Sequence, residues 1–89
     1  MSDMGRFRIV CVNKNSEGDI IRVGIEGLDV YGVDAVINDI RLEKNQFYTT
    51  ARGYPADVLI KPKRYGGYFL TTSPDGIQPN NLDYLPYCA

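Results

Sequence analysis

The sequence contains two cysteines, Cys11 and Cys88, which lie near opposite ends of the chain. Thiol groups can support redox chemistry or bind a metal, but two thiolates alone do not complete a tetrahedral zinc site. Neither cysteine has a basic residue within two positions that would favour its thiolate. Because free cysteines are among the most frequently buried residues, we expect two structural thiols and no disulfide scaffold. A redox-active or metal-binding thiol pair is the alternative.

Asp75 is a candidate for acid or metal-ligand chemistry. It lies in the segment Ser73-Pro74-Asp75-Gly76, where its carboxylate could act as an acid or, together with Asp83, as a metal ligand. Aspartates in such turns usually accept hydrogen bonds from their own backbone, so we expect a turn residue. The alternative class is a small thiol-based redox or metal-binding protein, or an enzyme, that uses Cys11, Cys88 and Asp75.

Several enzyme classes are disfavoured by what the sequence lacks. It contains no histidine, which argues against histidine-based triads and HExxH zinc sites. It also contains no GxxxxGK[ST] or GxGxxG motif, so a loop dedicated to binding phosphate has no support. We therefore expect a protein that is not an enzyme and that needs no cofactor and no metal.

A basic and aromatic segment, residues 61–72, offers the most promising surface. Adjacent glycines at 66 and 67 predict a two-residue hairpin turn. That register would place basic and aromatic side chains on one face, which could contact a partner together with Tyr54. A three-residue loop would mix the faces, and a solvated edge hairpin is the simpler alternative. The predicted binding residues are Tyr54, Lys61, Lys63, Arg64, Tyr65 and Tyr68.

The elements that must position these residues are predicted from hydrophobic periodicity. Apolar residues at 33, 36, 37 and 40 have the spacing of a helix with one buried face, and Asn45 is a candidate for its left-handed end. The segments before and after it are rich in β-branched and aromatic residues. We predict strands over residues 6–12, 20–25, 47–52, 56–64 and 68–72, a helix over 33–43, and a C-terminal tail that packs down. The first two strands form a hairpin over residues 6–25 with a long polar loop.

These elements predict an α+β fold of order ββαβββ, with an antiparallel sheet of four or five strands and one helix packed on one face. With 89 residues, the chain has the size of a single domain, 1–89. The hydrophobic fraction of 44% and the charged fraction of 24% are those of an ordinary globular protein.

Location and partners follow from charge and hydropathy. The first residues include an acid and no apolar signal core, and the longest apolar run covers only residues 9–12. We therefore expect a cytoplasmic protein without membrane contact. The net charge of −1 gives no general attraction to nucleic acid, which slightly favours a protein partner.

Two groups of residues resemble a mostly bacterial family known only as domain of unknown function 3892. The C-terminal group is Phe69-Leu70-x-Thr72-x-x-Asp75-Gly76 followed by Asn81-Leu82-x-x-Leu85-Pro86-x-Cys88, and the N-terminal group is Ile9-x-Cys11-Val12 with Ile21, Val23 and Gly24. The resemblance covers nearly the whole chain. It implies a small α+β domain and supplies no activity or catalytic residue. The function we expect is a small non-enzymatic binding or assembly module.

Overall fold

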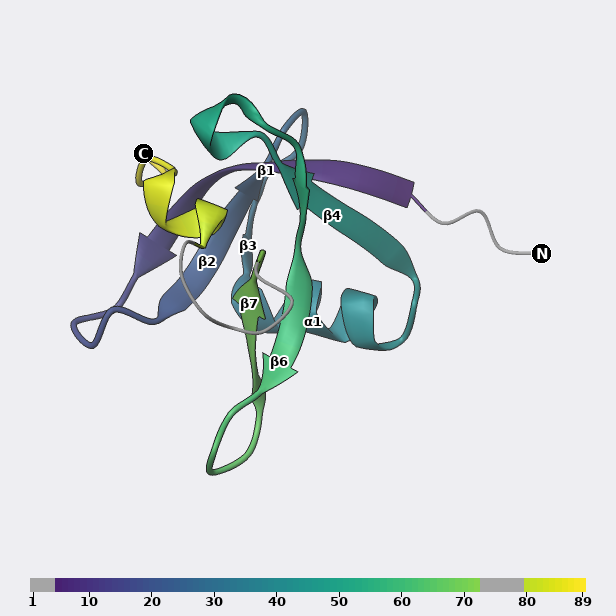
Figure 1. Cartoon of the computed structure of the whole chain (residues 1–89), viewed down its shortest axis with the longest axis vertical. Coiled ribbons are helices and arrows are strands. Elements are labelled where there is room, and N and C mark those ends of the chain that lie inside the picture. Colours follow the sequence, from purple (N-terminus) through teal and green to yellow (C-terminus); the bar gives the residue numbers. More distant parts are fainter. Residues whose placement is uncertain (1–4, 73–79) are drawn as a thin grey trace.

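The computed structural model describes residues 5–72 and 80–89, apart from the side chain of Arg52. Strands, one α-helix and two 3-10 turns alternate along these residues (Figure 1). In chain order they are β1 (Gly5–Lys14), β2 (Ile20–Ile25), β3 (Val30–Gly32), α1 (Val33–Arg41), β4 (Asn45–Thr49), η1 (Ala51–Gly53), β5 (Ala56–Asp57), β6 (Leu59–Pro62), β7 (Tyr68–Thr71) and η2 (Asn81–Tyr84).

The predicted α+β class is confirmed, although the sheet is mixed and not fully antiparallel. Within the described residues one sheet has the strand order β3-β2-β1-β4-β5, and a second contains β6 and β7. Strand β4 runs parallel to β1, with Phe7 beside Phe47. The reason is that α1 carries the chain back across the sheet, so that β4 starts at the same end as β1.

The N-terminal hairpin predicted over residues 6–25 is present. Strands β1 and β2 pair antiparallel, with Ile9 opposite Ile25 and Val12 opposite Val23. These four side chains are buried in the same core as Val36 of α1 and Leu82 of the tail. Strand β3 was not predicted, since its three residues are all exposed and show no apolar alternation.

The helix follows the predicted apolar stripe. Val36 is buried, and Val33, Ile37 and Ile40 pack against the core from the same side of α1. The left-handed residue at the end is Glu43, with φ 56°, and not Asn45. Asn45 begins β4 instead, where its side-chain oxygen accepts a hydrogen bond from the Gly5 backbone N–H at 3.1 Å.

The strand predicted over residues 56–64 is divided between the two sheets. β5 pairs with β4, whereas β6 pairs with β7. Between them Val58 is buried, and its backbone N–H donates to the Phe47 carbonyl at 2.9 Å. The chain therefore changes sheets at Val58, and this places the β6–β7 hairpin against the helix.

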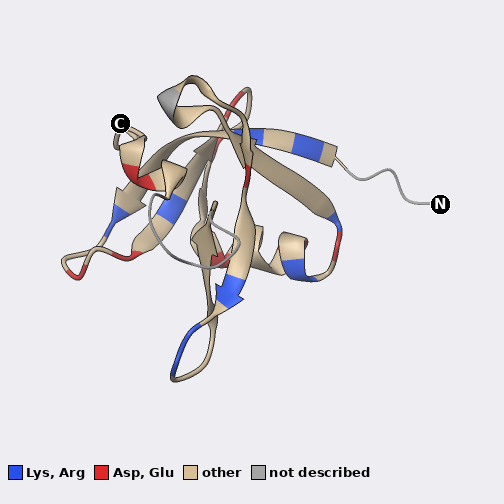
Figure 2. Ribbon diagram, viewed as in Figure 1, with Lys and Arg blue, Asp and Glu red and all other residues tan. Residues whose placement is uncertain are grey.

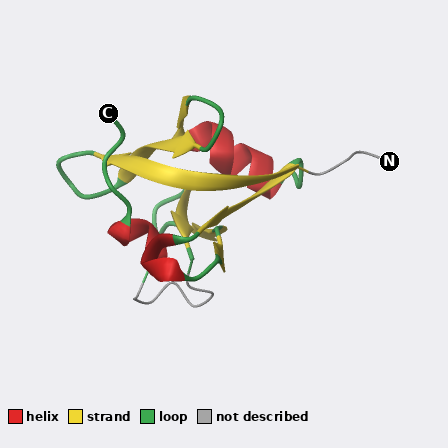
Figure 3. Cartoon of the chain, turned by 90° about the horizontal axis from the view of Figure 1, so that it is seen from above, coloured by secondary structure: helices red, strands yellow, loops and turns green. Residues whose placement is uncertain are grey.

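The C-terminal tail packs down as predicted. Leu82 of η2 is fully buried and belongs to the same core as Ile9, Val12 and Val36. The Asn80 side chain accepts from the Leu82 backbone N–H at 3.1 Å and so caps η2. The helix α1 and the 3-10 turns lie on opposite sides of β1 (Figure 3). Among the described residues, no helix has the length and apolar character needed to cross a membrane.

Candidate binding surface

The hairpin formed by β6 and β7 has a longer loop than the sequence suggested. Lys61 pairs with Phe69 and Pro62 with Tyr68, and the Lys63 backbone N–H donates to the Gly67 carbonyl at 2.8 Å. The loop therefore spans residues 64–66, and the prediction of a two-residue Gly66-Gly67 turn is wrong. Both glycines have positive φ, so both adopt the predicted left-handed conformation, but in a different register.

This register separates side chains that were predicted to share one face. Residues opposite each other in an antiparallel pair point to the same side, so Lys61 lies with Phe69, while Tyr68 lies with Pro62 on the other side. Leu70 shares the side of Tyr68, because alternate residues of a strand point the same way. A continuous face of Lys61, Tyr68 and Leu70 does not exist.

The free end of the hairpin carries the most exposed of the predicted binding residues. Tyr65 is 92% exposed, and the Arg64 guanidinium lies 5.7 Å from the centre of its ring. The loop extends away from the body of the molecule (Figure 1), and basic residues mark the end of β6 and the side of the loop that follows it (Figure 2). We call residues 63–66 the hairpin tip.

Tyr54 does not join this surface. It is 75% exposed and directly follows η1, which lies at the opposite end of the molecule from the hairpin tip (Figure 1). Tyr68 is nearer the tip and contacts the helix, with the Arg41 guanidinium 5.9 Å from the centre of its ring. The structure therefore places Lys63, Arg64 and Tyr65 at the free end of the hairpin, Tyr68 beside the helix, and Tyr54 apart from both.

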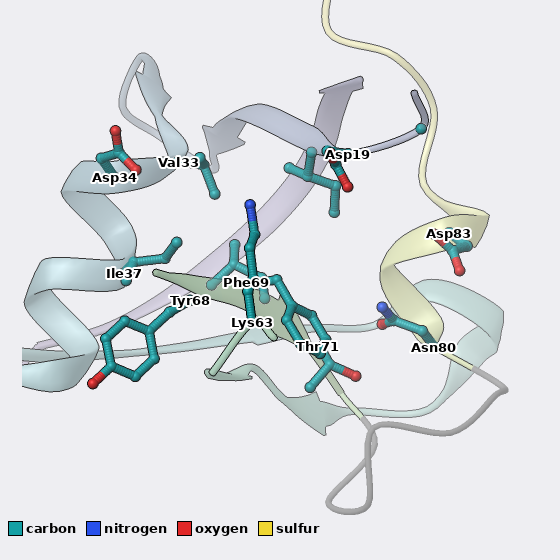
Figure 4. Close-up of a pocket in the computed structure, with 13 residues that line it drawn as sticks. Asp19, Val33, Asp34, Ile37, Lys63, Tyr68, Phe69, Thr71, Asn80 and Asp83 are labelled. Atoms are coloured by element: carbon teal, nitrogen blue, oxygen red, sulfur yellow. The ribbon is translucent and has the colours of Figure 1, made fainter. Parts of the chain in front are cut away.

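A cleft of about 470 Å³ opens between the hairpin and the rest of the molecule. Its volume lies within the range of roughly 300 to 1,000 Å³ that is typical of ligand pockets. Four segments that are distant in the sequence line it, and Figure 4 shows their side chains converging. The lining residues are Gly18, Asp19, Ile20, Val33, Asp34, Ile37, Lys63, Tyr68, Phe69, Leu70, Thr71, Asn80 and Asp83.

The cleft combines apolar walls with charged groups at its rim. Lys63 points from the hairpin into the space, across from Asp34 of α1 and Asp19 of the β1–β2 connection (Figure 4). Asp83 is held by Lys14, whose Nζ lies 2.9 Å from its Oδ1. Among the described residues, Asp19 and Asp34 form no ion pair. The rim therefore has an excess of negative charge.

The two cysteines form a disulfide, so the expectation of two free thiols is wrong. Cys11 on β1 and Cys88 in the tail are bonded, with their Cα atoms 5.0 Å apart. The packed tail returns Cys88 to the side of β1, and this proximity is the physical reason for the bond. Asp75 lies outside the described residues, and no cluster of three or more potential metal ligands occurs among those residues.

Sequence reasoning missed several residues of the cleft, among them Asp19, Asp34 and Phe69. Each has an ordinary explanation in its own segment, as a loop acid, a first-turn helix acid and a strand aromatic. These residues are neighbours only because four segments of the chain come together at the cleft. No local pattern in the sequence would have revealed this.

The family model described as "Protein of unknown function (DUF3892)" matches residues 8–86. The match includes Cys11, the hairpin and Leu82, and it ends two residues before Cys88. No curated protein matches the chain. No solved structure matches it either.

Proposed function

This chain belongs to the DUF3892 family, and we propose that it is a small non-enzymatic module that binds a protein partner through the hairpin tip and the adjacent cleft. The observation that carries the proposal is the hairpin tip itself. An aromatic side chain that is 92% exposed lies beside an arginine on a loop that projects from the body.

Tyrosine and arginine are the residue types that most often dominate the energetics of protein interfaces. Tyr65 makes little contact with the body of the molecule, because almost all of its surface is exposed. Its removal should therefore have little effect on folding, whereas a partner that covers it would lose a large contact. This combination supports a role in recognition.

The cleft offers a second point of contact next to the hairpin tip. Ile20, Val33 and Phe69 supply apolar walls, and Phe69 is 37% exposed. The carboxylates of Asp19 and Asp34 at the rim favour a partner side chain that carries a positive charge on an aliphatic stem. The partner segment that enters the cleft therefore contains a lysine or an arginine.

Protein is preferred over nucleic acid because the surface has mixed charge. Lys63 and Arg64 could contact phosphates, but Asp19 and Asp34 line the same cleft and would repel them. The net charge of −1 supplies no compensating attraction. A bacterial, cytoplasmic setting remains our expectation.

The double variant Arg64→Ala/Tyr65→Ala tests the proposal. We expect its free energy of unfolding to change by less than about 0.5 kcal/mol, because both side chains are exposed. Its affinity for the partner should fall at least about tenfold. The measurement compares proteins retained from the native cell lysate by wild type and variant, followed by titration of the purified partner.

The matched control is Lys44→Ala/Tyr54→Ala, which removes one exposed basic residue and one exposed tyrosine away from the hairpin tip. It should retain the partner as wild type does. Equal retention by the tip variant would refute the proposal. So would a captured species that disappears after nuclease treatment, since the partner would then depend on nucleic acid.

A further inference from the structure

The last residues of the chain complete an edge of the main sheet. Strand β4 pairs with β1 only along residues 5–8, which leaves the later part of β1 open on that side. The tail fills this place, with Tyr87 beside Val12 in a parallel bridge. The Val12 backbone N–H donates to the Pro86 carbonyl at 3.0 Å, and the Cys88 N–H donates to the Val12 carbonyl at 3.3 Å.

The tail has an inner part that is anchored firmly and an outer part that is not. In the inner part Leu82 is fully buried, and the Asn80 side chain accepts from the Thr72 N–H at 3.2 Å. In the outer part Pro86, Tyr87 and Ala89 are exposed, with Tyr87 at 69%. Besides the disulfide, the described residues hold the outer tail through two backbone hydrogen bonds and one from the Asn13 side chain to the Cys88 carbonyl at 3.3 Å.

So few surface hydrogen bonds do little more than offset the conformational entropy that the outer tail loses on docking. The covalent bond therefore decides whether the outer tail stays in place. While Cys88 is bonded to Cys11, the tail cannot leave β1. Once the bond is broken, local opening of residues 86–89 requires neither Leu82 nor the core to move.

We propose that the Cys11–Cys88 disulfide is a redox-sensitive latch that holds the outer tail, residues 86–89, on the edge of β1. A dithiol reductant opens it by thiol–disulfide exchange. One of its thiolates attacks a sulfur of the pair, a mixed disulfide forms, and the other cysteine leaves as a thiolate. The second thiol of the reductant then displaces the first cysteine. The reductant becomes a disulfide, and two protons and two electrons pass to Cys11 and Cys88.

Two features of the fold suit the bond to this role. Cys88 is flanked by the exposed Tyr87 and Ala89, so a reductant can approach from that side. Release of the tail then exposes the backbone N–H and carbonyl of Val12. An unpaired strand edge of this kind can accept an extended segment from a partner. The latch is independent of the hairpin tip.

Amide hydrogen exchange of the wild-type protein, with and without dithiothreitol, tests the latch. The amides of Val12 and Cys88 report on the docked tail, and those of Ile25 and Val58, which donate to Asp29 and Phe47, report on the rest of the fold. After reduction we expect protection at Val12 and Cys88 to fall about tenfold or more relative to Ile25 and Val58. An equal fall at all four amides would show that the bond only stabilises the whole fold, and no change would show that the tail stays docked. Either result overturns the proposal.

Digestion with a carboxypeptidase gives a second, independent test. The reduced wild type should lose Ala89 and Cys88 faster than the oxidised protein does. The variant Cys11→Ser/Cys88→Ser should behave like the reduced protein without any reductant. If reduced and oxidised proteins are trimmed at the same rate, residues 86–89 are not released by reduction.

Discussion

Gly24 is the residue of β2 against which the disulfide packs. A Cβ atom at this position would collide with the Sγ of Cys11 and would lie 3.2 Å from the Sγ of Cys88. Gly24 is also buried, whereas Cys11 and Cys88 are half-buried. The absence of a side chain at position 24 is therefore a steric requirement of the bonded pair.

The variant Gly24→Ala should destabilise the oxidised protein by about 1–3 kcal/mol, the usual cost of overpacking a close contact. In the reduced protein the cost should be smaller, because separate sulfur atoms can move apart. Urea unfolding with and without reductant measures both values. Gly32→Ala is the matched control, since a Cβ there meets no atom within 4 Å, and it should cost less than about 1 kcal/mol. Equal costs at position 24 in both redox states would contradict this reading.

The position of the 3-10 turn η2 depends on one buried side chain, that of Leu82. A 3-10 turn of four residues has little stability of its own, and Leu82 is its only fully buried residue. Its side chain belongs to the same core cluster as Val12 of β1 and Val36 of α1. Leu82 therefore fixes the tail on the body and keeps Asn80 and Asp83 at the cleft.

Leu82→Ala should lower the free energy of unfolding by about 2–5 kcal/mol, which is the range for large-to-small changes in a packed core. Leu28→Ala is the control, because Leu28 is 59% exposed, and it should cost less than about 0.5 kcal/mol. Chemical denaturation followed by circular dichroism gives both values. A small effect at Leu82 would mean that the tail contributes little to the core.

Elements with a strong local pattern were predictable from the sequence. The helix followed from the spacing of Val33, Val36, Ile37 and Ile40, and the first hairpin from two β-branched runs around a polar loop. The register of the second hairpin was not predictable. Two adjacent glycines permit positive φ in more than one loop, and the local sequence does not decide between them.

The cleft and the disulfide both depend on contacts between segments that are far apart in the sequence. The cleft brings together residues from 18–20, 33–37, 63–71 and 80–83, and the bond joins cysteines separated by 77 positions. The sequence allowed the tail to bring Cys88 back to the first strand, but the choice between thiols and a disulfide followed from the expected redox compartment. The exposure of the tip residues was predictable, because a glycine-containing loop between two strands lies at the surface.

The hairpin tip is, in our proposal, the surface that binds a protein partner in the cell. Site-specific photo-crosslinking tests it most directly, with a photoreactive phenylalanine analogue replacing Tyr65 in one variant and Tyr54 in a second. Both positions are highly exposed, at 92% and 75%, but only the first lies on the hairpin tip. We expect a discrete protein adduct from position 65 and none from position 54. Adducts of equal yield from both positions, or an adduct at 65 that nuclease removes, would contradict it.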